Sequence, residues 1–166
     1  MKRLFPLLLL ALAACSDPDL REAAPGVSLL KSFSMAEAAA GAFAWRLDAD
    51  TGRLDEKKGV IIFTAPRIKF FTKDAVSSEI TSRAGLLRMH EKSAELTDEV
   101  EVNSKTDGMR LKTTKLYYSS ARAKIWTEEP VTIYKGRTVI IGRGFTANPD
   151  LSEIEIRHQE TRLVSR

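Results

Sequence analysis

Apolar and polar residues alternate along most of the chain from Phe43 onward. Within residues 94–103, Leu96, Val100 and Val102 fall on one side of an extended chain, whereas Glu99 and Glu101 fall on the other. Such alternation is typical of a strand with one buried and one solvated face. The pattern therefore predicts antiparallel β-structure for this part of the chain.

Turn signals interrupt the alternating segments every eight to twelve residues. Asp107-Gly108, between two such segments, is a strong hairpin signal. The predicted fold is all-β, an antiparallel β-jelly roll or open two-sheet β-sandwich with an apolar groove. Strands are expected at residues 44–49, 59–65, 67–73, 76–83, 85–91, 94–103, 109–118, 122–127, 131–134, 138–145, 153–158 and 161–164.

The apolar face of these strands is expected to line the space between the two sheets. Taken alone, such a face is more simply an ordinary core than a ligand site, because nearly every small β-domain has one. The candidate groove residues are Ile61, Phe63, Ile68, Phe70, Val76, Ile80, Leu96, Val100, Val102, Leu111, Ile133, Val139, Ile141, Ile154 and Ile156.

The first 14 residues differ from the rest, because Lys2 and Arg3 precede an apolar run at residues 4–14. This run is about half the ~20 residues that a membrane-spanning helix needs, which predicts an export signal peptide. Leu12-Ala13-Ala14-Cys15 matches a lipobox, so Cys15 is the expected acylated lipid anchor; the alternative is a free thiol behind an ordinary signal peptide. Residues 15–42 are expected to form a tether, with a helical turn at 35–42. The β-domain is then expected at 43–166.

Charge is distributed unevenly along the chain, whose formal net charge is +4. Loss of the leader with Lys2 and Arg3 lowers it to +2, which gives little reason to expect nucleic acid binding. Residues 105–124 hold six basic residues and one acidic residue, whereas 91–101 hold five acidic residues and one lysine. The simpler interpretation is two solvated strand faces paired across the sheet; the alternative is a basic face for lipid phosphates.

Catalytic and metal-binding signatures are sparse. Cys15 is the only cysteine, which excludes a disulfide or thiolate cluster within one chain. His90 and His158 are the only histidines, and the sequence has no metalloprotease spacing, nucleophile elbow or phosphate-binding glycine loop. Glu99 and Glu101 share a face, which a solvated strand explains. The sequence predicts neither an enzyme nor a cofactor or metal.

Short motifs follow one another in a characteristic order from about Phe33 to the C-terminus. The motifs are Trp45-Arg46-Leu47-Asp48-Ala49, 65–71, 96–102, Asp107-Gly108, Leu111-x-Thr113, Leu116-Tyr117-Tyr118, Thr127-x-x-Pro130-Val131-x-Ile133 and Ile140-Ile141-Gly142-x-Gly144-Phe145. In series they resemble the LptC family of lipopolysaccharide export proteins and the related OstA-like β-jelly-roll proteins.

The resemblance implies lipid carriage rather than catalysis. It places the protein on the periplasmic side of the inner membrane, where lipopolysaccharide passes from an ABC transporter to an OstA-like bridge protein. By this analogy the acyl chains of lipid A occupy the groove, the N-terminal sheet edge docks on the transporter and the C-terminal edge docks on the bridge protein. The residues expected at these edges are Trp45, Leu47 and Ile61, and Ile154, Ile156 and Leu163.

Two features depart from the family pattern. Many members carry an N-terminal transmembrane helix, whereas this chain is expected to use the acylated Cys15. Ser16 after it does not mark retention in the inner membrane, so the outer membrane is the alternative location. Two further interpretations stay open: an outer-membrane lipoprotein acting as a scaffold or assembly factor, and a glycan-binding lipoprotein, which would need a polar cleft.

Overall fold

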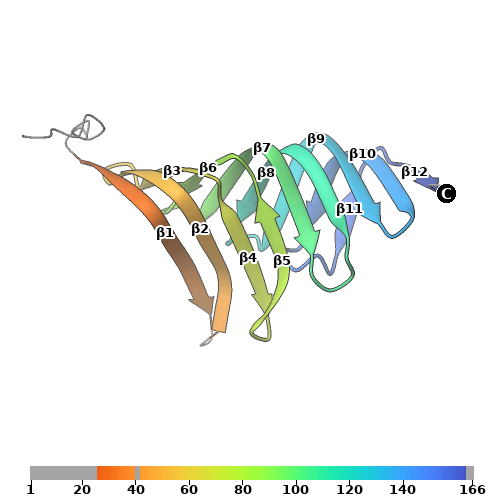
Figure 1. Ribbon diagram of the computed structural model, residues 1–166, viewed down its shortest axis with the longest axis horizontal. Coiled ribbons are helices and arrows are strands. Elements are labelled where there is room, and N and C mark those ends of the chain that lie inside the picture. Colours follow the sequence, from red (N-terminus) through yellow and green to blue (C-terminus); the bar gives the residue numbers. More distant parts are fainter. Residues whose placement is uncertain (1–25, 40–41, 164–166) are drawn as a thin grey trace, which may run out of the picture.

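Twelve β-strands form one antiparallel sheet in the computed structural model, which describes residues 26–39 and 42–163 (Figure 1). These residues contain no helix long and apolar enough to cross a membrane. The predicted leader, Cys15 and the start of the tether lie outside them. The all-β prediction is confirmed. The strands are β1 (Val27–Ala39), β2 (Ala42–Asp55), β3 (Val60–Thr64), β4 (Arg67–Thr72), β5 (Ala75–Thr81), β6 (Ala84–Arg88), β7 (Ser93–Ser104), β8 (Arg110–Ser119), β9 (Lys124–Lys135), β10 (Thr138–Ala147), β11 (Ile154–Ile156) and β12 (Glu160–Leu163).

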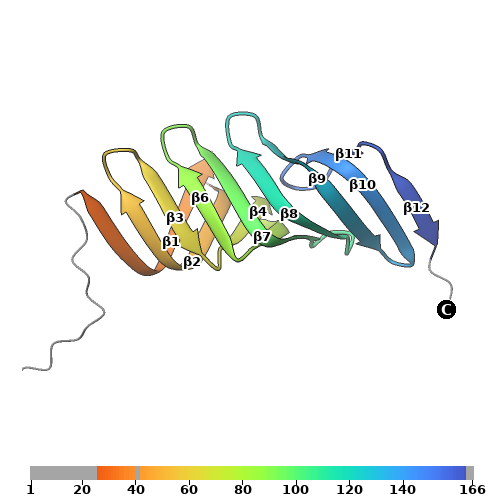
Figure 2. The same ribbon diagram turned by 90° about the horizontal axis from the view of Figure 1, so that it is seen from above.

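The sheet folds back on itself because its long strands contribute to two layers (Figure 2). Residues 45–48 of β2 pair with β4, and residues 51–55 pair with β3. Likewise, residues 101–104 of β7 pair with β5, and residues 93–97 pair with β6. One half of each long strand thus lies in a first layer with β4, β5 and β12, and the other half in a second layer with β3, β6 and β11.

The long strands bend where their pairing passes from one layer to the other. The backbone there enters the left-handed region, with φ of 62° at Asp98, 51° at Glu99 and 82° at Gly144. Glycine adopts this conformation freely, whereas other residues do so only under constraint. We infer that the paired strand halves on both sides hold these bends in place. The bend residues with positive φ are Ser32, Ala65, Asp98, Glu99, Gly144 and His158.

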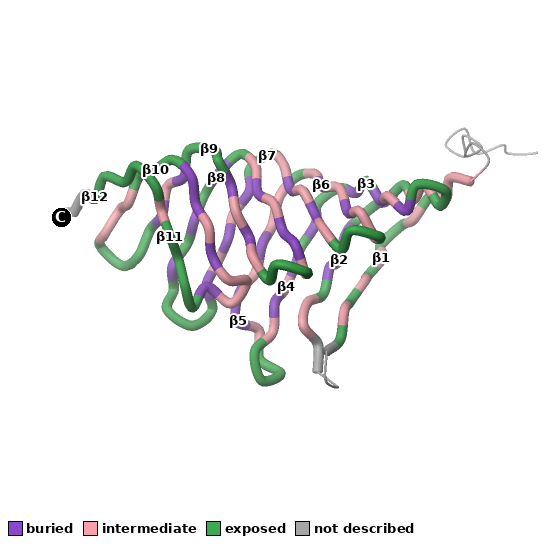
Figure 3. Tube along the Cα trace, turned by 180° about the vertical axis from the view of Figure 1, so that it is seen from behind, coloured by how far each residue is buried: buried purple, intermediate pink, exposed green. Residues whose placement is uncertain are grey.

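Buried apolar side chains fill the space between the layers. The buried residues, purple in Figure 3, recur along the strands of both layers. In the second layer, Phe63 and Leu96 flank Gly85, and a Cβ added to Gly85 would lie 2.3 Å from the Phe63 ring. In the first layer an inward row of cross-strand neighbours runs through six strands. Its members are Leu47, Ile68, Ile80, Val102, Leu111 and Ile133, all of them buried.

The strand β1 replaces part of the predicted tether and the predicted helical turn. It runs antiparallel to β2, from Val27 opposite Asp55 to Ala39 opposite Ala42. Leu30, Phe33 and Met35 pack against the core. Small alanine and serine side chains around them hide the alternation in the sequence. The sheet therefore begins at residue 27, and the predicted domain start at residue 43 is wrong.

The orientation of β10 is a second correction. Residues 139–141 are apolar without interruption, so alternation cannot assign their faces. Ile140 lies opposite the buried Ile133 and packs on the core, which places it on the inner face. Val139 and Ile141 therefore lie on the outer face, where Ile141 is 39% exposed. Their predicted inward orientation is wrong.

Candidate functional site

A cleft of about 430 Å³ opens between the two layers at the strand ends away from the bends. The end of β4 forms one wall, and the β8–β9 turn with residues 148–150 forms the other. The rings of Phe70 and Tyr118 meet edge to face there, with centroids 5.0 Å apart. The cleft thus reaches the apolar interior. It is lined by Ala44, Phe70, Phe71, Thr72, Tyr118, Ser120, Ala123, Asn148, Pro149 and Asp150.

A carboxylate from the edge strand β1 joins the two layers beside this cleft. Glu37 Oε1 accepts a hydrogen bond from Lys92 Nζ at 2.8 Å, and its Oε2 accepts from Trp45 Nε1 at 2.8 Å and Ser120 Oγ at 2.9 Å. Trp45 belongs to the first layer, whereas Lys92 and Ser120 lie in turns at the end of the second. These four residues, here called the Glu37 latch, hold the layers together.

The latch donors stabilise the ionised form of Glu37. The hydrogen bond from Lys92, followed by those from Trp45 and Ser120, lowers the pKa of Glu37 from 4.5 to about 2. Burial instead raises the pKa of Tyr118, which keeps its phenol protonated. The latch is therefore ionic at neutral pH, while the floor of the cleft stays uncharged.

Glu37→Gln is expected to lower the free energy of unfolding at pH 7 by about 1–2 kcal/mol, because three donors lose a charged acceptor. The folded pKa of about 2 lies below the ordinary 4.5, so this stabilisation is present above pH 4.5 and is lost as pH falls toward 2. Urea unfolding of both proteins between pH 7 and pH 2 measures the difference. The exposed Glu155→Gln is the control. A difference that persists undiminished at pH 2 would contradict the latch.

The structure buries ten of the fifteen predicted groove residues. Val76, Val139 and Ile156 are half-buried, whereas Ile141 and Ile154 are each 39% exposed. Phe70 is the member of the set that also lines the cleft. The interior is therefore a packed apolar core, and Phe70 belongs both to this core and to the lining of the cleft. The ten buried residues are Ile61, Phe63, Ile68, Phe70, Ile80, Leu96, Val100, Val102, Leu111 and Ile133.

The sheet edges differ from the sequence prediction at the N-terminal end. Trp45, Leu47 and Ile61 lie on β2 and β3, and both strands have neighbours on each side. The N-terminal edge is β1 instead, because β2 is its pairing partner within the described residues. At the other end β11 and β12 are the edge strands; they hold Ile154 and Ile156, and Leu163.

Sequence reasoning missed the latch and the cleft wall. Glu37 lies in a segment predicted to be a tether, and Trp45 was assigned to an edge. Tyr118 belongs to a sequence motif, and the sequence predicts no role for its side chain. An aromatic residue at the last inward position of a strand was the available signal for Tyr118, but no local pattern marks Glu37.

The two histidines and the acidic residues form no metal site in the part of the chain that the structure describes. No three His, Cys, Asp or Glu residues there are placed to hold a metal ion. His90 lies against Gly59 beyond the end of β6, whereas His158 lies at the bend between β11 and β12. The buried side-chain nitrogen and oxygen atoms of these described residues all have hydrogen-bond partners.

Comparisons with known proteins match the sequence to a protein family and the fold to solved structures. A family model described as "Lipopolysaccharide-assembly, LptC-related" matches residues 21–162, a span that includes β1. Nine chains of solved structures match the fold. One is LptH from Pseudomonas aeruginosa, described as the LptA homologous periplasmic component of the conserved lipopolysaccharide transport device. It is 11% identical, with a TM-score of 0.58 over 73% of this chain and 95% of that chain, a likeness that shows the fold alone. A search of curated proteins finds no match.

Proposed function

Because the chain belongs to the LptC-related family of lipopolysaccharide-assembly proteins, we propose that it carries lipopolysaccharide through the periplasm. It receives the lipid from an inner-membrane ABC transporter, holds the acyl chains between its two layers and passes them to the next OstA-like bridge subunit. The sugars and phosphates of the lipid stay in water.

The cleft beside Phe70 and Tyr118 is the observation that carries this proposal, because there the apolar interior reaches solvent. On one side the layers are joined by the long strands themselves, which bend from one layer into the other. On the cleft side the Glu37 latch and a hydrogen bond from Ser78 Oγ to the Pro149 carbonyl oxygen connect them. An acyl chain gains roughly 0.8 kcal/mol per buried methylene. About ten methylenes would therefore outweigh several hydrogen bonds worth about 1 kcal/mol each.

The two sheet edges support transfer to and from neighbouring proteins. An edge strand presents unpaired N–H and C=O groups to which a partner can add a strand. We assign β1 to the transporter side, and β11 and β12 to the next bridge subunit. Strand addition would align the interiors of the two proteins, so a lipid could move between them without crossing water.

Acylated Cys15 is proposed to anchor the protein on the periplasmic side of the inner membrane. Eleven residues separate Cys15 from Val27 at the start of β1, a reach of at most about 40 Å. Cys15→Ser is expected to move the protein from the membrane fraction to the soluble periplasm, because the acyl chains are the proposed membrane attachment. Immunoblots of separated inner membranes, outer membranes and periplasm measure this. Retention of the variant in a membrane fraction would contradict the anchor.

Titration of the purified protein from Ser16 onward with the host's lipopolysaccharide tests the carrier proposal. Saturable binding that phospholipid fails to displace is expected. A folded β-sheet circular dichroism spectrum without lipopolysaccharide binding would overturn it. The outer-membrane scaffold that Ser16 permits would then be the better function.

A further inference from the structure

A hollow opens on the outer face of the second layer, where two serines lie opposite each other. Ser93 on β7 and Ser119 on β8 are cross-strand partners. Ala94 follows the first serine, Tyr118 precedes the second, and both belong to the core, so the serines lie on the other face. Their small side chains leave a space of about 300 Å³, at the lower end of the range for small-ligand sites. The hollow is lined by Arg88, Glu91, Ser93, Ala94, Tyr117, Tyr118, Ser119, Arg122 and Trp126.

Two aromatic rings border this hollow. Tyr117 on β8 and Trp126 on β9 are cross-strand partners, and their rings stack with centroids 5.6 Å apart and an interplanar angle of 22°. The guanidinium carbon of Arg122 lies 5.6 Å from the centroid of Trp126, and Lys115 Nζ lies 5.7 Å from that of Tyr117. An aromatic pair across two strands stabilises a sheet wherever it occurs. Beside a polar hollow it also offers an apolar surface to a ligand.

The charged groups around the hollow nearly balance. Arg88 lies 4.0 Å from both Glu91 and Glu95, at the limit of an ion pair. Lys115 pairs with Glu95 at 2.9 Å. Together with Arg122, three basic groups therefore face two carboxylates. The rim offers hydrogen-bond donors and acceptors side by side, without a strong net charge.

The charged residues next to the hollow on β9 have partners elsewhere. Lys124, two residues before Trp126, lies 3.5 Å from Glu153. Glu128, two residues after Trp126, pairs with Arg157. Neither residue therefore changes the balance of charge at the hollow.

The hollow and the cleft lie on either side of the β8–β9 turn. Arg122 in this turn lines the hollow, whereas Ala123 beside it lines the cleft. Tyr118, just before the turn, contributes to the lining of both. A glycolipid with an acyl chain in the cleft could therefore lay its sugars over the turn and into the hollow.

We propose that this outer hollow binds a sugar ring of the lipopolysaccharide whose acyl chains enter the cleft. The C–H groups of a pyranose ring pack on aromatic side chains, here Tyr117 and Trp126. Its hydroxyl groups bind guanidinium donors and carboxylate acceptors, here Arg88, Arg122 and Glu91. A protein partner fits less well, because none of the large hydrophobics exposed among the described residues lines the hollow. The carried lipid as the source of the sugar rests on the proposed function.

Calorimetric titration of the purified protein with lipopolysaccharide oligosaccharide freed of its acyl chains tests the hollow. Such a probe has no acyl chain to enter the cleft, so it reports on the sugar site. Trp126→Ala removes part of the stacking surface, and Ser93→Leu fills the hollow while leaving both rings in place. Each variant is expected to weaken binding at least about tenfold. The midpoint of urea unfolding shows whether each variant keeps its fold.

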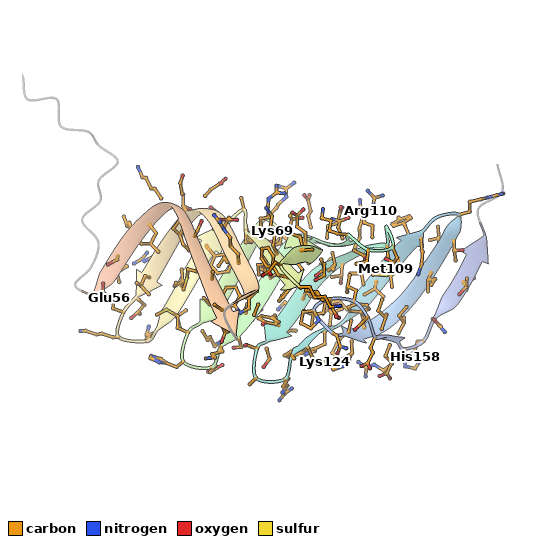
Figure 4. All side chains as sticks on the ribbon, turned by 90° about the horizontal axis from the view of Figure 1, so that it is seen from below. Glu56, Lys69, Met109, Arg110, Lys124 and His158 are labelled. Carbon is orange, nitrogen blue, oxygen red and sulfur yellow. The ribbon has the colours of Figure 1, made fainter. Side chains whose placement is uncertain are left out.

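The matched controls lie at outward positions away from the hollow. Tyr134→Ala removes an aromatic ring that also carries a guanidinium group, with the Arg110 carbon 5.2 Å from its centroid. Arg110 lies on the side of the molecule opposite to Lys124, which begins β9 (Figure 4). Thr64→Leu places the same new side chain at an exposed position of β3. Both controls should bind the oligosaccharide within about twofold of the wild type.

Several outcomes would overturn the proposal. These are wild-type affinity in both hollow variants, equal losses in the controls, or no binding of the oligosaccharide by the wild type. Binding of muropeptides from digested peptidoglycan in place of the oligosaccharide, lost in the same variants, would overturn the assignment to the carried lipid. Binding of intact lipopolysaccharide without binding of the oligosaccharide removes this inference alone. Oligosaccharide binding without binding of the intact lipid would instead overturn the carrier proposal and leave a sugar site.

Discussion

Phe63→Ala is expected to lower the free energy of unfolding by about 3–5 kcal/mol. The Phe63 side chain is 1% exposed and packs over Gly85 beside Leu96 in the second layer. Gly85 has no side chain that could move into the vacated space, so a cavity should remain. The midpoint and slope of urea unfolding measure the loss.

Ile62→Ala is the matched control for this replacement. Ile62 is the preceding residue of β3, but its side chain faces outward and is 56% exposed. Its removal should change the free energy of unfolding by less than about 0.5 kcal/mol. Similar losses at residues 62 and 63 would contradict the assignment of inner and outer faces in the second layer.

Ala44→Glu is expected to weaken lipopolysaccharide binding at least about tenfold, because acyl chains entering the cleft would have to desolvate a carboxylate. Ala44 is half-buried and lines the cleft next to the end of β4. Titration with lipopolysaccharide measures the affinity. The midpoint of urea unfolding shows whether the variant keeps its fold.

Ala36→Glu supplies the same chemical change on the neighbouring strand. Ala36 is exposed and lies opposite Arg46, so its side chain faces away from the cleft. This variant should bind lipopolysaccharide as the wild type does. An equal loss of affinity in the two variants would show that added negative charge, rather than the cleft, controls binding.

The sequence predicted most strands but not how they divide between layers. Alternation located both ends of β7 and both ends of β8 to within one residue. Residues 122–127 and 131–134 were expected to be two strands, yet β9 continues through Pro130. Asp50-Thr51-Gly52 follows the strand expected at residues 44–49 and has the composition of a turn, yet it lies inside β2. Glycine, proline and short polar residues mark the bends of this fold as well as its turns, and sequence alone does not separate the two uses.

The candidate site was less accessible to sequence reasoning than the core. Buried residues such as Ile80 and Leu111 follow a local period, which reveals them without knowledge of the fold. The latch depends on contacts from Glu37 to Lys92 and Ser120, 55 and 83 residues away in the sequence. Such contacts leave no local pattern. Val139 and Ile141 were misassigned for the opposite reason, because three adjacent apolar residues fit either face.

The order of the strands also predicts which strands should unfold locally most often. Each long strand, or bent pair of short strands, pairs with the next one along the chain, so the described part is a nearly one-dimensional array. Stability in such an array is approximately a sum of terms between neighbours, and it is lowest at the ends. Amide hydrogens of β11 and β12, with three and four residues, should exchange first, and those of β7 and β8 last. A partner strand added at an edge would turn the terminal element into an internal one, so protection from exchange should spread inward from the docked end.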